Sequence, residues 1–186
     1  MPLFQQLSSI IVILCILVGM RSFTASNPEK PDVYHADQAA DALEDARKLL
    51  LESHQVNAEL LAPGFYKSAM LRYNETRIMK AQRYKSAVVL KSALEAVSLF
   101  SKAIQQSGKN QVALSDVLRL RKSAGYLPAD DVLKDIWHEA DFFLQQAGRE
   151  HEKNRPLKAE IAAKQAKQLY HQLLFEAKSL LKRPEA

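Results

Sequence analysis

Cysteine is nearly absent from this chain of 186 residues. The single cysteine, Cys15, lies in an apolar N-terminal stretch, and none follows it. The rest of the chain therefore forms no internal disulfide, no thiolate nucleophile and no cysteine-based metal site. Such a sequence tolerates an oxidising compartment, but it is also ordinary for a cytosolic protein.

Glycine and proline are also scarce, with five and seven copies, and no long stretch alternates apolar and polar residues. A β-sheet is therefore not expected. Alanine, leucine, lysine, glutamine and glutamate dominate instead, and these residues favour helices. The apolar fraction of 47% supports one modest core. We predict an all-α chain of antiparallel helical hairpins, with about five to six helices in a bundle or short array after an N-terminal apolar segment.

The first twenty residues contain no charged side chain. Ile10–Met20 is their most apolar part and has the length of a signal-peptide core, but it is short for a complete membrane span. Small residues at Thr24–Ser26 suit a cleavage site, whereas the lysine or arginine that usually precedes such a core is lacking. Residues 1–26 are therefore predicted to be a cleaved signal peptide or a retained membrane anchor, with residues 3–20 contacting the membrane if the segment is retained.

A third interpretation is a lipoprotein signal in which Cys15 is acylated. A large residue, Leu14, precedes this cysteine where a small one is usual, and apolar sequence continues after it. An inert Cys15 is therefore preferred. Residues 27–34 are predicted to be a polar linker, and the rest of the chain to be periplasmic or membrane-associated.

Proline and glycine punctuate the helical pattern after the linker. Pro63-Gly64 ends a first helix at Leu61 and starts a second near Phe65, because proline lacks an amide hydrogen and disfavours a helical residue before it. The two helices are expected to form an antiparallel hairpin. The other predicted features are a helix stop at Ser107-Gly108, a connector over Lys109–Ala113, a short helix over Ser115–Ala124, a helix opened by Pro128, a polar loop over Gly148–Arg155 and a last helix from Pro156.

A degenerate repeat runs through the chain. Four alanine, leucine and aromatic positions recur at a spacing of 70 residues: Ala93, Ala96, Leu99 and Phe100 match Ala163, Ala166, Leu169 and Tyr170. Pro63 and Pro128 match at a spacing of 65. Chance similarity between alanine-rich helices is the alternative. The repeat predicts two helical units, residues 35–108 and 109–183, each unable to bury its apolar face alone.

Alanine, tyrosine and proline positions between Ala42 and Ala69 form a recognisable string. It comprises Ala42-Leu43, Ala46-Arg47, Ala58, Ala62-Pro63 and Tyr66-x-x-Ala69, followed by Tyr84-x-x-Ala87 and the alanine-rich Ala93–Ala103. The string covers about residues 36–106 and resembles an uncharacterised family of bacterial envelope proteins, helical-hairpin lipoproteins that sometimes precede an OmpA-like domain. The resemblance implies an exported helical module of the cell envelope, with no known activity and no functional residue to carry over.

Tyr84-x-x-Ala87 also resembles part of a tetratricopeptide unit. Gln82 stands where that unit has a loop glycine, and Lys91 stands where it has an aromatic residue. The resemblance therefore implies tetratricopeptide-like packing without membership of that family.

Residue combinations that support catalysis or metal binding are lacking. His138-Glu139 begins like a zinc-protease motif, but Phe142 stands where the second histidine is needed, and there is no glycine-rich phosphate loop. Five carboxylates are predicted to form a solvated helix edge: Asp130, Asp131, Asp135, Glu139 and Asp141. No catalytic, metal-binding or cofactor-binding residue is predicted, and the chain is not expected to be an enzyme.

A basic segment is the strongest candidate for ligand binding. It contains one acidic residue, Glu75, against seven cations: Lys67, Arg72, Arg77, Lys80, Arg83, Lys85 and Lys91. Tyr66, Tyr73 and Tyr84 are interleaved as candidate groove aromatics that could stack on bases. The face could bind cell-wall polymer, anionic lipid or nucleic acid, although export disfavours nucleic acid. The preferred interpretation is internal: the acidic first helix lies beside the second and neutralises its cations.

Two functions follow from these patterns. The first is a non-enzymatic, exported or membrane-tethered helical scaffold that presents a groove or face to an unknown envelope protein, with Trp137, Phe142, Phe143 and Tyr170 mostly in the core. The second is a binder of anionic polymer or lipid through the Lys67–Lys91 face. The net charge of +5 is too small to name a partner, and the sequence leaves the oligomeric state open.

Overall fold

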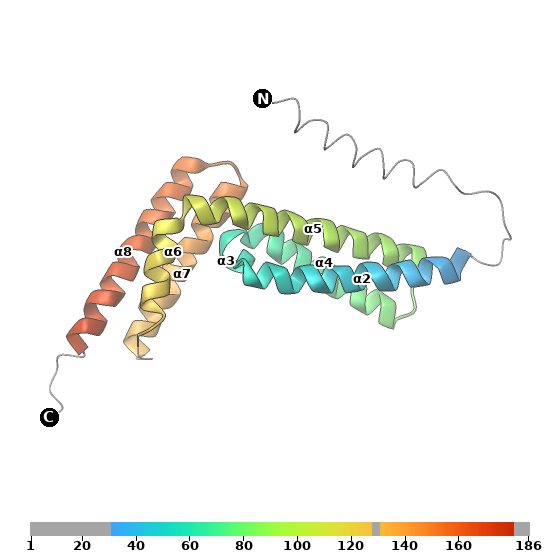
Figure 1. Ribbon diagram of the computed structural model, residues 1–186, viewed down its shortest axis with the longest axis horizontal. Helices are drawn as coiled ribbons and strands as arrows, with labels where there is room; N and C mark the ends of the chain where they lie inside the picture. The colour runs from blue at the N-terminus through green and yellow to red at the C-terminus, as the bar shows by residue number, and fades with distance from the viewer. Residues whose placement is uncertain (1–30, 128–130, 181–186) are drawn as a thin grey trace. The chain divides into compact units, whose positions relative to one another are not determined.

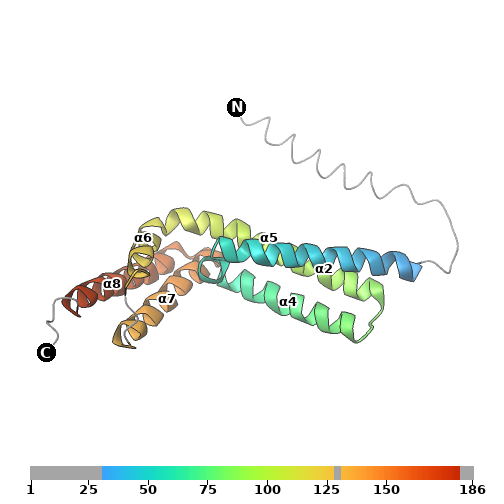
Figure 2. The same cartoon turned by 60° about the horizontal axis from the view of Figure 1, so that its bottom comes forward.

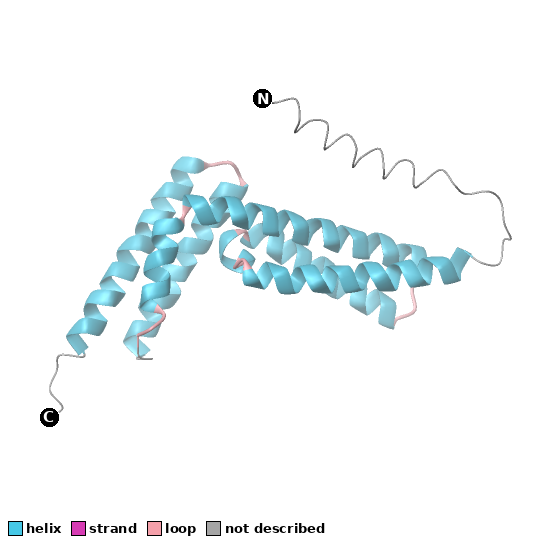
Figure 3. Ribbon diagram, in the orientation of Figure 1, coloured by secondary structure: helices cyan, strands magenta, loops and turns pink. Residues whose placement is uncertain are grey.

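The computed structural model describes residues 31–127 and 131–180. Within these ranges the chain forms seven helices and no strand, which confirms the predicted all-α class (Figures 1 and 3). The helices are α2 (Pro31–Gln55), α3 (Ala58–Leu61), α4 (Pro63–Ala81), α5 (Ser86–Ala113), α6 (Ser115–Ala124), α7 (Asp131–Glu152) and α8 (Pro156–Leu180). The predicted signal or anchor, Cys15 and Pro128 lie outside the described residues.

The first predicted helix is divided. Asn57 has a left-handed backbone (φ 54°, ψ 41°), so α2 ends at Gln55 and α3 forms a single separate turn. Ala62 then adopts an extended φ of −136°, and Pro63 opens α4, where its missing amide hydrogen leaves no bond unmade. The break at residues 56–57 was not predicted, and α4 starts at Pro63, two residues before the start predicted near Phe65. In Figures 1 and 2, α2 and α4 run side by side in opposite directions, as expected for a hairpin.

Two predicted helix ends are wrong because glycine does not end either helix. α5 continues through Gly108 to Ala113, and α7 continues through Gly148 to Glu152. Ser107 and Asn110 are buried on α5, and the Asn110 amide donates a hydrogen bond of 2.6 Å to the carbonyl oxygen of Leu61. Burial of this face outweighs the helix propensity that glycine lacks, about 1 kcal/mol.

Small residues dominate both parts of the core. Around α2, α4 and α5, Ala46, Ala69, Ala96 and Ala103 are buried together with Phe100. A second cluster joins α6, α7 and α8 to α3, and it contains larger side chains such as Leu144 and Leu173. Alanine stripes let helix axes approach closely, so a modest apolar fraction still fills the interior.

The helices α4–α5 and α7–α8 are antiparallel hairpins with matching registers. All six buried positions of α8 lie 70 residues after a buried position of α5: Ala159, Ala162, Ala166, Tyr170, Leu173 and Ala177. On the first helices the spacing is 71, since Ala69, Tyr73 and Thr76 correspond to Ala140, Leu144 and Ala147. The predicted spacing of 70 thus coincides with equivalent packing positions, whereas the predicted proline match at 65 differs from the spacing of 71 on the first helices.

The structure does not divide the chain as the two predicted units do. Helices from Asp32 onward belong to one compact unit. The predicted boundary after residue 108 falls inside α5, and α2 begins at Pro31 within the predicted linker over residues 27–34.

Candidate functional site

The seven cations of the basic segment do not form one site. Lys67 lies in the second turn of α4, and it is thirteen positions before Lys80, about 20 Å along a helix. Arg72 is half-buried and binds Glu75 and Glu95, each at 3.1 Å. Lys67 therefore lies at the opposite end of α4 from the other cations, and Arg72 is engaged in internal ion pairs. Neither residue contributes to a shared binding face.

Two of the three candidate groove tyrosines belong to the core. Tyr73 is only 8% exposed and meets Phe100 edge to face, with ring centroids 6.2 Å apart. Tyr66 is half-buried between His54 and Phe100. Neither ring is free to stack on a ligand, which corrects the prediction for both. Tyr84 alone of the three is exposed.

Internal neutralisation of the cations by the first helix is also not seen. The acidic residues Glu44 and Asp45 pair along α2 itself, with Arg47 and Lys48. No ion pair joins α2 to α4 among the residues that the structure describes. The acidic helix α2 and the basic helix α4 instead pack against each other through their apolar faces.

The remaining cations gather where α4 turns into α5. Arg77 and Lys80 lie in the last turns of α4, and Arg83 and Lys85 lie in the connection. Three exposed apolar or aromatic residues lie among them: Ile78, Tyr84 and Val88. These seven residues are called the turn patch. Lys91 is one turn further along α5 and lines a separate groove.

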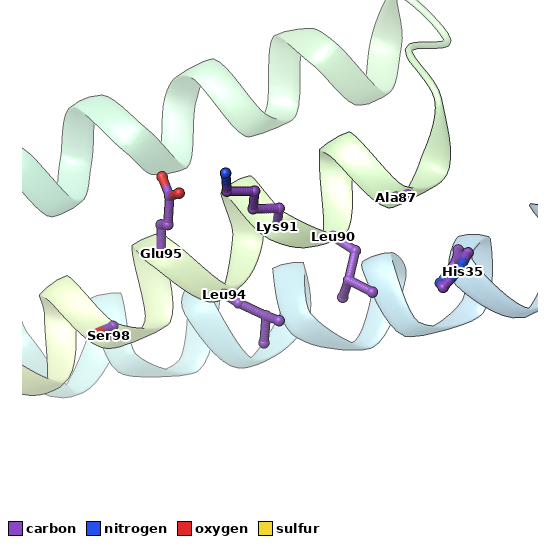
Figure 4. Close-up of a pocket in the computed structure, with 7 residues that line it drawn as sticks. All are labelled: His35, Ala87, Leu90, Lys91, Leu94, Glu95 and Ser98. Atoms are coloured by element: carbon purple, nitrogen blue, oxygen red, sulfur yellow. The ribbon is translucent and has the colours of Figure 1, made fainter. Parts of the chain in front are cut away.

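That groove lies between α2 and the first half of α5, with a volume of about 480 Å³ (Figure 4). Its lining is mostly apolar and consists of His35, Ala87, Leu90, Lys91, Leu94, Glu95 and Ser98. Figure 4 shows Leu90 and Leu94 pointing toward α2, while Lys91 and Glu95 point the other way, toward α4. Leu94 is 53% exposed, so its side chain is only partly covered. The groove is open, apolar at its base and charged along one edge.

A third feature is a polar cluster that joins α6, α7 and α8. Arg121 binds Asp141 in a bidentate manner, with N–O distances of 2.7 and 3.0 Å. The Tyr170 hydroxyl donates to the same carboxylate. The Arg121 guanidinium also lies 5.1 Å from the centroid of Trp137, whose ring meets Tyr170 edge to face. Asp141 therefore fixes three helices to one another.

The electrostatics of the polar cluster favour structure over catalysis. Burial, followed by the hydrogen bond to Asp141, raises the pKa of Tyr170 well above its ordinary value, so its phenol stays protonated. The carboxylate accepts three hydrogen bonds, two from Arg121 and one from Tyr170. Asp141 also lines a cavity of about 310 Å³ with His54, Asn57 and Gln145 among its walls.

The sequence predicted a different place for Asp141, at a solvated helix edge. Its side chain is only 18% exposed. The available signal was its spacing from Trp137 and Leu144, which puts a carboxylate inside the apolar stripe of α7. Its partner Tyr170 is 29 residues away, so no local pattern could identify the pair. Trp137, Phe143 and Tyr170 contact the core as expected, but Phe142 is exposed.

Metal binding and membrane insertion are two further possibilities for the described part of the chain. No group of three or more histidine, aspartate or glutamate side chains there could hold a metal ion. None of the helices in that part is both long and apolar enough to cross a bilayer.

No protein-family model, curated protein or solved structure matches this chain. The resemblance to envelope helical-hairpin proteins and the resemblance to tetratricopeptide packing therefore stay predictions. The features that follow for function are the α2–α5 groove and the turn patch, since both lie open to solvent on well-packed helices.

Proposed function

We propose that this protein is a non-enzymatic helical interaction module, exported or tethered at a membrane, that receives an amphipathic helix of an envelope protein in the α2–α5 groove. The single observation behind this proposal is the partly covered Leu94 in a mostly apolar groove of about 480 Å³. A half-exposed leucine beside a groove wall gains free energy when a partner removes it from water, about 25 cal/mol per Å².

The spacing of the groove residues fits a helix as the occupant. Ala87, Leu90 and Leu94 lie three and four residues apart on α5, so they form one stripe along its surface. A partner helix with apolar residues at the same spacing lays its own stripe into such a groove. Lys91 on the edge suits an acidic residue of the partner, whereas Glu95 is already bound by Arg72.

The place of action follows from the sequence and is part of the proposal. The apolar residues 3–20 supply export or tethering, and the resemblance to envelope helical-hairpin proteins favours the same compartment. A helical scaffold without its own chemistry is the function that such a resemblance implies.

A site-specific photo-crosslinker at position 94, in the native cell, tests the groove. We expect a defined partner to crosslink at position 94 and not at Val112, which is 79% exposed near the other end of the same helix. The captured partner is then purified, and its binding to the full chain is measured.

Leu94→Glu is the variant that tests the contact, and Val112→Glu is its matched control. We expect Leu94→Glu to weaken the purified interaction by at least about tenfold, which equals 1.4 kcal/mol. Equal loss in both variants, or full binding by Leu94→Glu with unchanged helicity, would mean that the groove is not the docking site.

A further inference from the structure

We propose that the turn patch binds the headgroup region of an anionic phospholipid bilayer, so that the α4–α5 turn rests on the membrane surface. This site is separate from the α2–α5 groove, and it would operate whether or not the groove has a protein partner. It also narrows the predicted Lys67–Lys91 face to four cations and three apolar residues at one end of the hairpin.

The cations of the turn patch are open to an external anion, although the Arg77 guanidinium also lies 5.8 Å from the centroid of the Tyr73 ring. All four are exposed, and no carboxylate of the described residues lies within ion-pair distance of any of them. The nearest acidic residues on these two helices, Glu75 and Glu95, are both bound by Arg72. Asp37 and Asp41, exposed acids in the first half of α2, form no ion pair with any of the four cations.

The apolar members of the patch distinguish a bilayer from a soluble polyanion. Ile78 is 55% exposed, Tyr84 is 53% exposed and Val88 is 45% exposed. Aliphatic side chains among cations fit the boundary between headgroups and acyl chains, and tyrosine is enriched there. A single-stranded nucleic acid would need several stacking rings, but Tyr66 and Tyr73 are occupied in the core. The mixture therefore favours lipid.

The path of the chain points to the same end of the hairpin. His35 near the start of α2 lines the groove together with Ala87 from the first turn of α5. Figures 1 and 2 both show the start of α2 beside the α4–α5 turn. Ten residues, 21–30, connect that point to the apolar residues 3–20, and an extended chain of this length spans at most about 35 Å. A retained anchor would thus hold the patch within reach of the bilayer.

The backbone of Arg83 gives an independent indication. Its φ of 56° is in the left-handed region, where a long side chain is disfavoured and glycine or asparagine is usual. The turn between α7 and α8 has Asn154 in this conformation, with a φ of 54°. Folding alone would favour asparagine or glycine at position 83, so the cation there is better explained by an external contact.

The test uses the full chain reconstituted into vesicles, with an environment-sensitive fluorophore at position 84 in a Cys15→Ser background. Phosphatidylcholine vesicles with and without phosphatidylglycerol are compared. We expect a blue-shifted probe, quenched by headgroup-labelled lipid, only with phosphatidylglycerol. Raising the salt from about 0.1 M to about 1 M shortens the Debye length from about 10 to about 3 Å and should reverse the shift.

Two charge variants make the test specific. R77Q/K80Q/R83Q/K85Q removes the patch cations, and each is expected to contribute about fivefold to the occupancy of the surface-bound state. K102Q/K109Q/K122Q/K164Q removes four exposed lysines outside the patch and should leave the signal unchanged. Circular dichroism checks that both variants remain folded.

Three outcomes would overturn the proposal. The probe signal could be the same with and without phosphatidylglycerol, or both charge variants could lose it equally. A soluble polyanion such as RNA or heparin could also displace the turn from the vesicles with the same dependence on the four cations, which would make the patch a polyanion site. A probe at the exposed Val112 reports the background expected without surface contact.

Discussion

The α4–α5 and α7–α8 hairpins share one packing frame but place their polar groups differently. Each contains an edge-to-face aromatic pair at equivalent positions: Tyr66 with Phe100 at 6.4 Å, and Trp137 with Tyr170 at 5.9 Å. Each also joins its helices through a residue with left-handed backbone, Arg83 or Asn154. These equivalent positions belong to the packing that the two hairpins share. The positions at which the hairpins differ are therefore the place to look for a separate role of each hairpin.

Each hairpin buries polar side chains at positions where the other hairpin has apolar ones. In the first, Thr76 and Ser92 form a hydrogen bond of 2.7 Å, and the corresponding positions of the second are the alanines 147 and 162. In the second, Asp141 accepts from Tyr170, and the corresponding positions of the first are Met70 and Phe100. Thr76 and Ser92 pair within the first hairpin, and Asp141 and Tyr170 pair within the second. The buried Ser107 hydroxyl of α5 makes no hydrogen bond to any described residue.

The turns differ more than the interiors. In the second hairpin, Glu152 caps α4, since its carboxylate accepts from the amides of Gly64 and Phe65 at 3.0 and 2.9 Å. Lys153 and Arg155 both form ion pairs with Glu150. The cations of the first turn have no such partners among the described residues. The charged residues of the α7–α8 turn therefore make contacts within the protein, whereas the cations of the α4–α5 turn remain available to a ligand.

The largest expected effect comes from making the second interior resemble the first. Tyr170→Phe supplies the residue found at position 100 and removes a hydrogen bond to a charged group, so it should lower the free energy of unfolding by about 1.5–3 kcal/mol. Urea denaturation measures this change. The reciprocal Phe100→Tyr should also destabilise, because its hydroxyl would be buried without the counterpart of Asp141. A Tyr170→Phe protein as stable as the original would show that the hydroxyl contributes nothing.

The same variant makes a prediction about pH. Burial raises the pKa of Tyr170 above that of an unfolded tyrosine, so folding stabilises the protonated phenol. This contribution is complete below about pH 10, the ordinary tyrosine value, and is lost as the pH rises above it. Tyr170→Phe should therefore lose less stability than the original protein between neutral and strongly alkaline pH. Parallel stability curves for the two proteins would contradict this assignment.

The second effect contrasts the two helical glycines that were predicted to end helices. A Cβ at Gly148 would lie 2.6 and 2.9 Å from the carbonyl oxygens of Leu61 and Leu60, so Gly148→Ala should cost about 1–3 kcal/mol. At Gly108 nothing lies within 4 Å of the added carbon, so Gly108→Ala should stabilise by about 0.5–1 kcal/mol. Thermal melts of both variants give the comparison, and equal effects would show that the close approach at Gly148 is unimportant.

The third effect concerns the turn that is used within the fold. Glu152→Ala removes the acceptor of two amides at the start of α4 and should cost about 0.5–2 kcal/mol. Hydrogen exchange at Gly64 and Phe65 should become faster at the same time. Lys80→Ala at the end of α4 is the control, with a change within about 0.5 kcal/mol. Unchanged exchange at the two amides would refute the capping role.

The smallest effect tests the cost of the cation in the free turn. Arg83→Gly should stabilise by about 0.5–1 kcal/mol, because glycine adopts a positive φ without steric conflict. Asn154→Gly should change stability less, since asparagine already tolerates this conformation. Chemical denaturation of both variants gives the difference. A larger gain at position 154 would remove the argument that Arg83 is retained against its backbone preference.

Local signals predicted well where the chemistry is local. Ser115–Ala124 forms α6 as expected, and Pro156 opens α8. These boundaries depend on proline geometry and on residues within one turn. The stops predicted at Gly108 and Gly148 failed because both helices pack against α3, and their contacts come from distant residues.

The candidate sites were predicted less completely. The basic segment was identified from composition, but the exposure of each cation depends on which helices lie beside it. Arg72 and Tyr73 lie in the middle of that segment. Arg72 forms an ion pair with Glu95 of α5, and Tyr73 packs edge to face against Phe100 of α5. The groove was expected in general terms only, because its walls come from two helices about 50 residues apart along the chain.

The sequence by itself determined the helical class, the alanine stripes and the repeated register, because propensity, spacing and proline geometry act within a few residues. Only the tertiary structure decided which helices continue through glycine, which cations remain in solvent and how Asp141 is paired. The physical reason is one of range. Hydrogen bonds between residues 49 and 88 positions apart, and the burial around them, outweigh local preferences of about 1 kcal/mol.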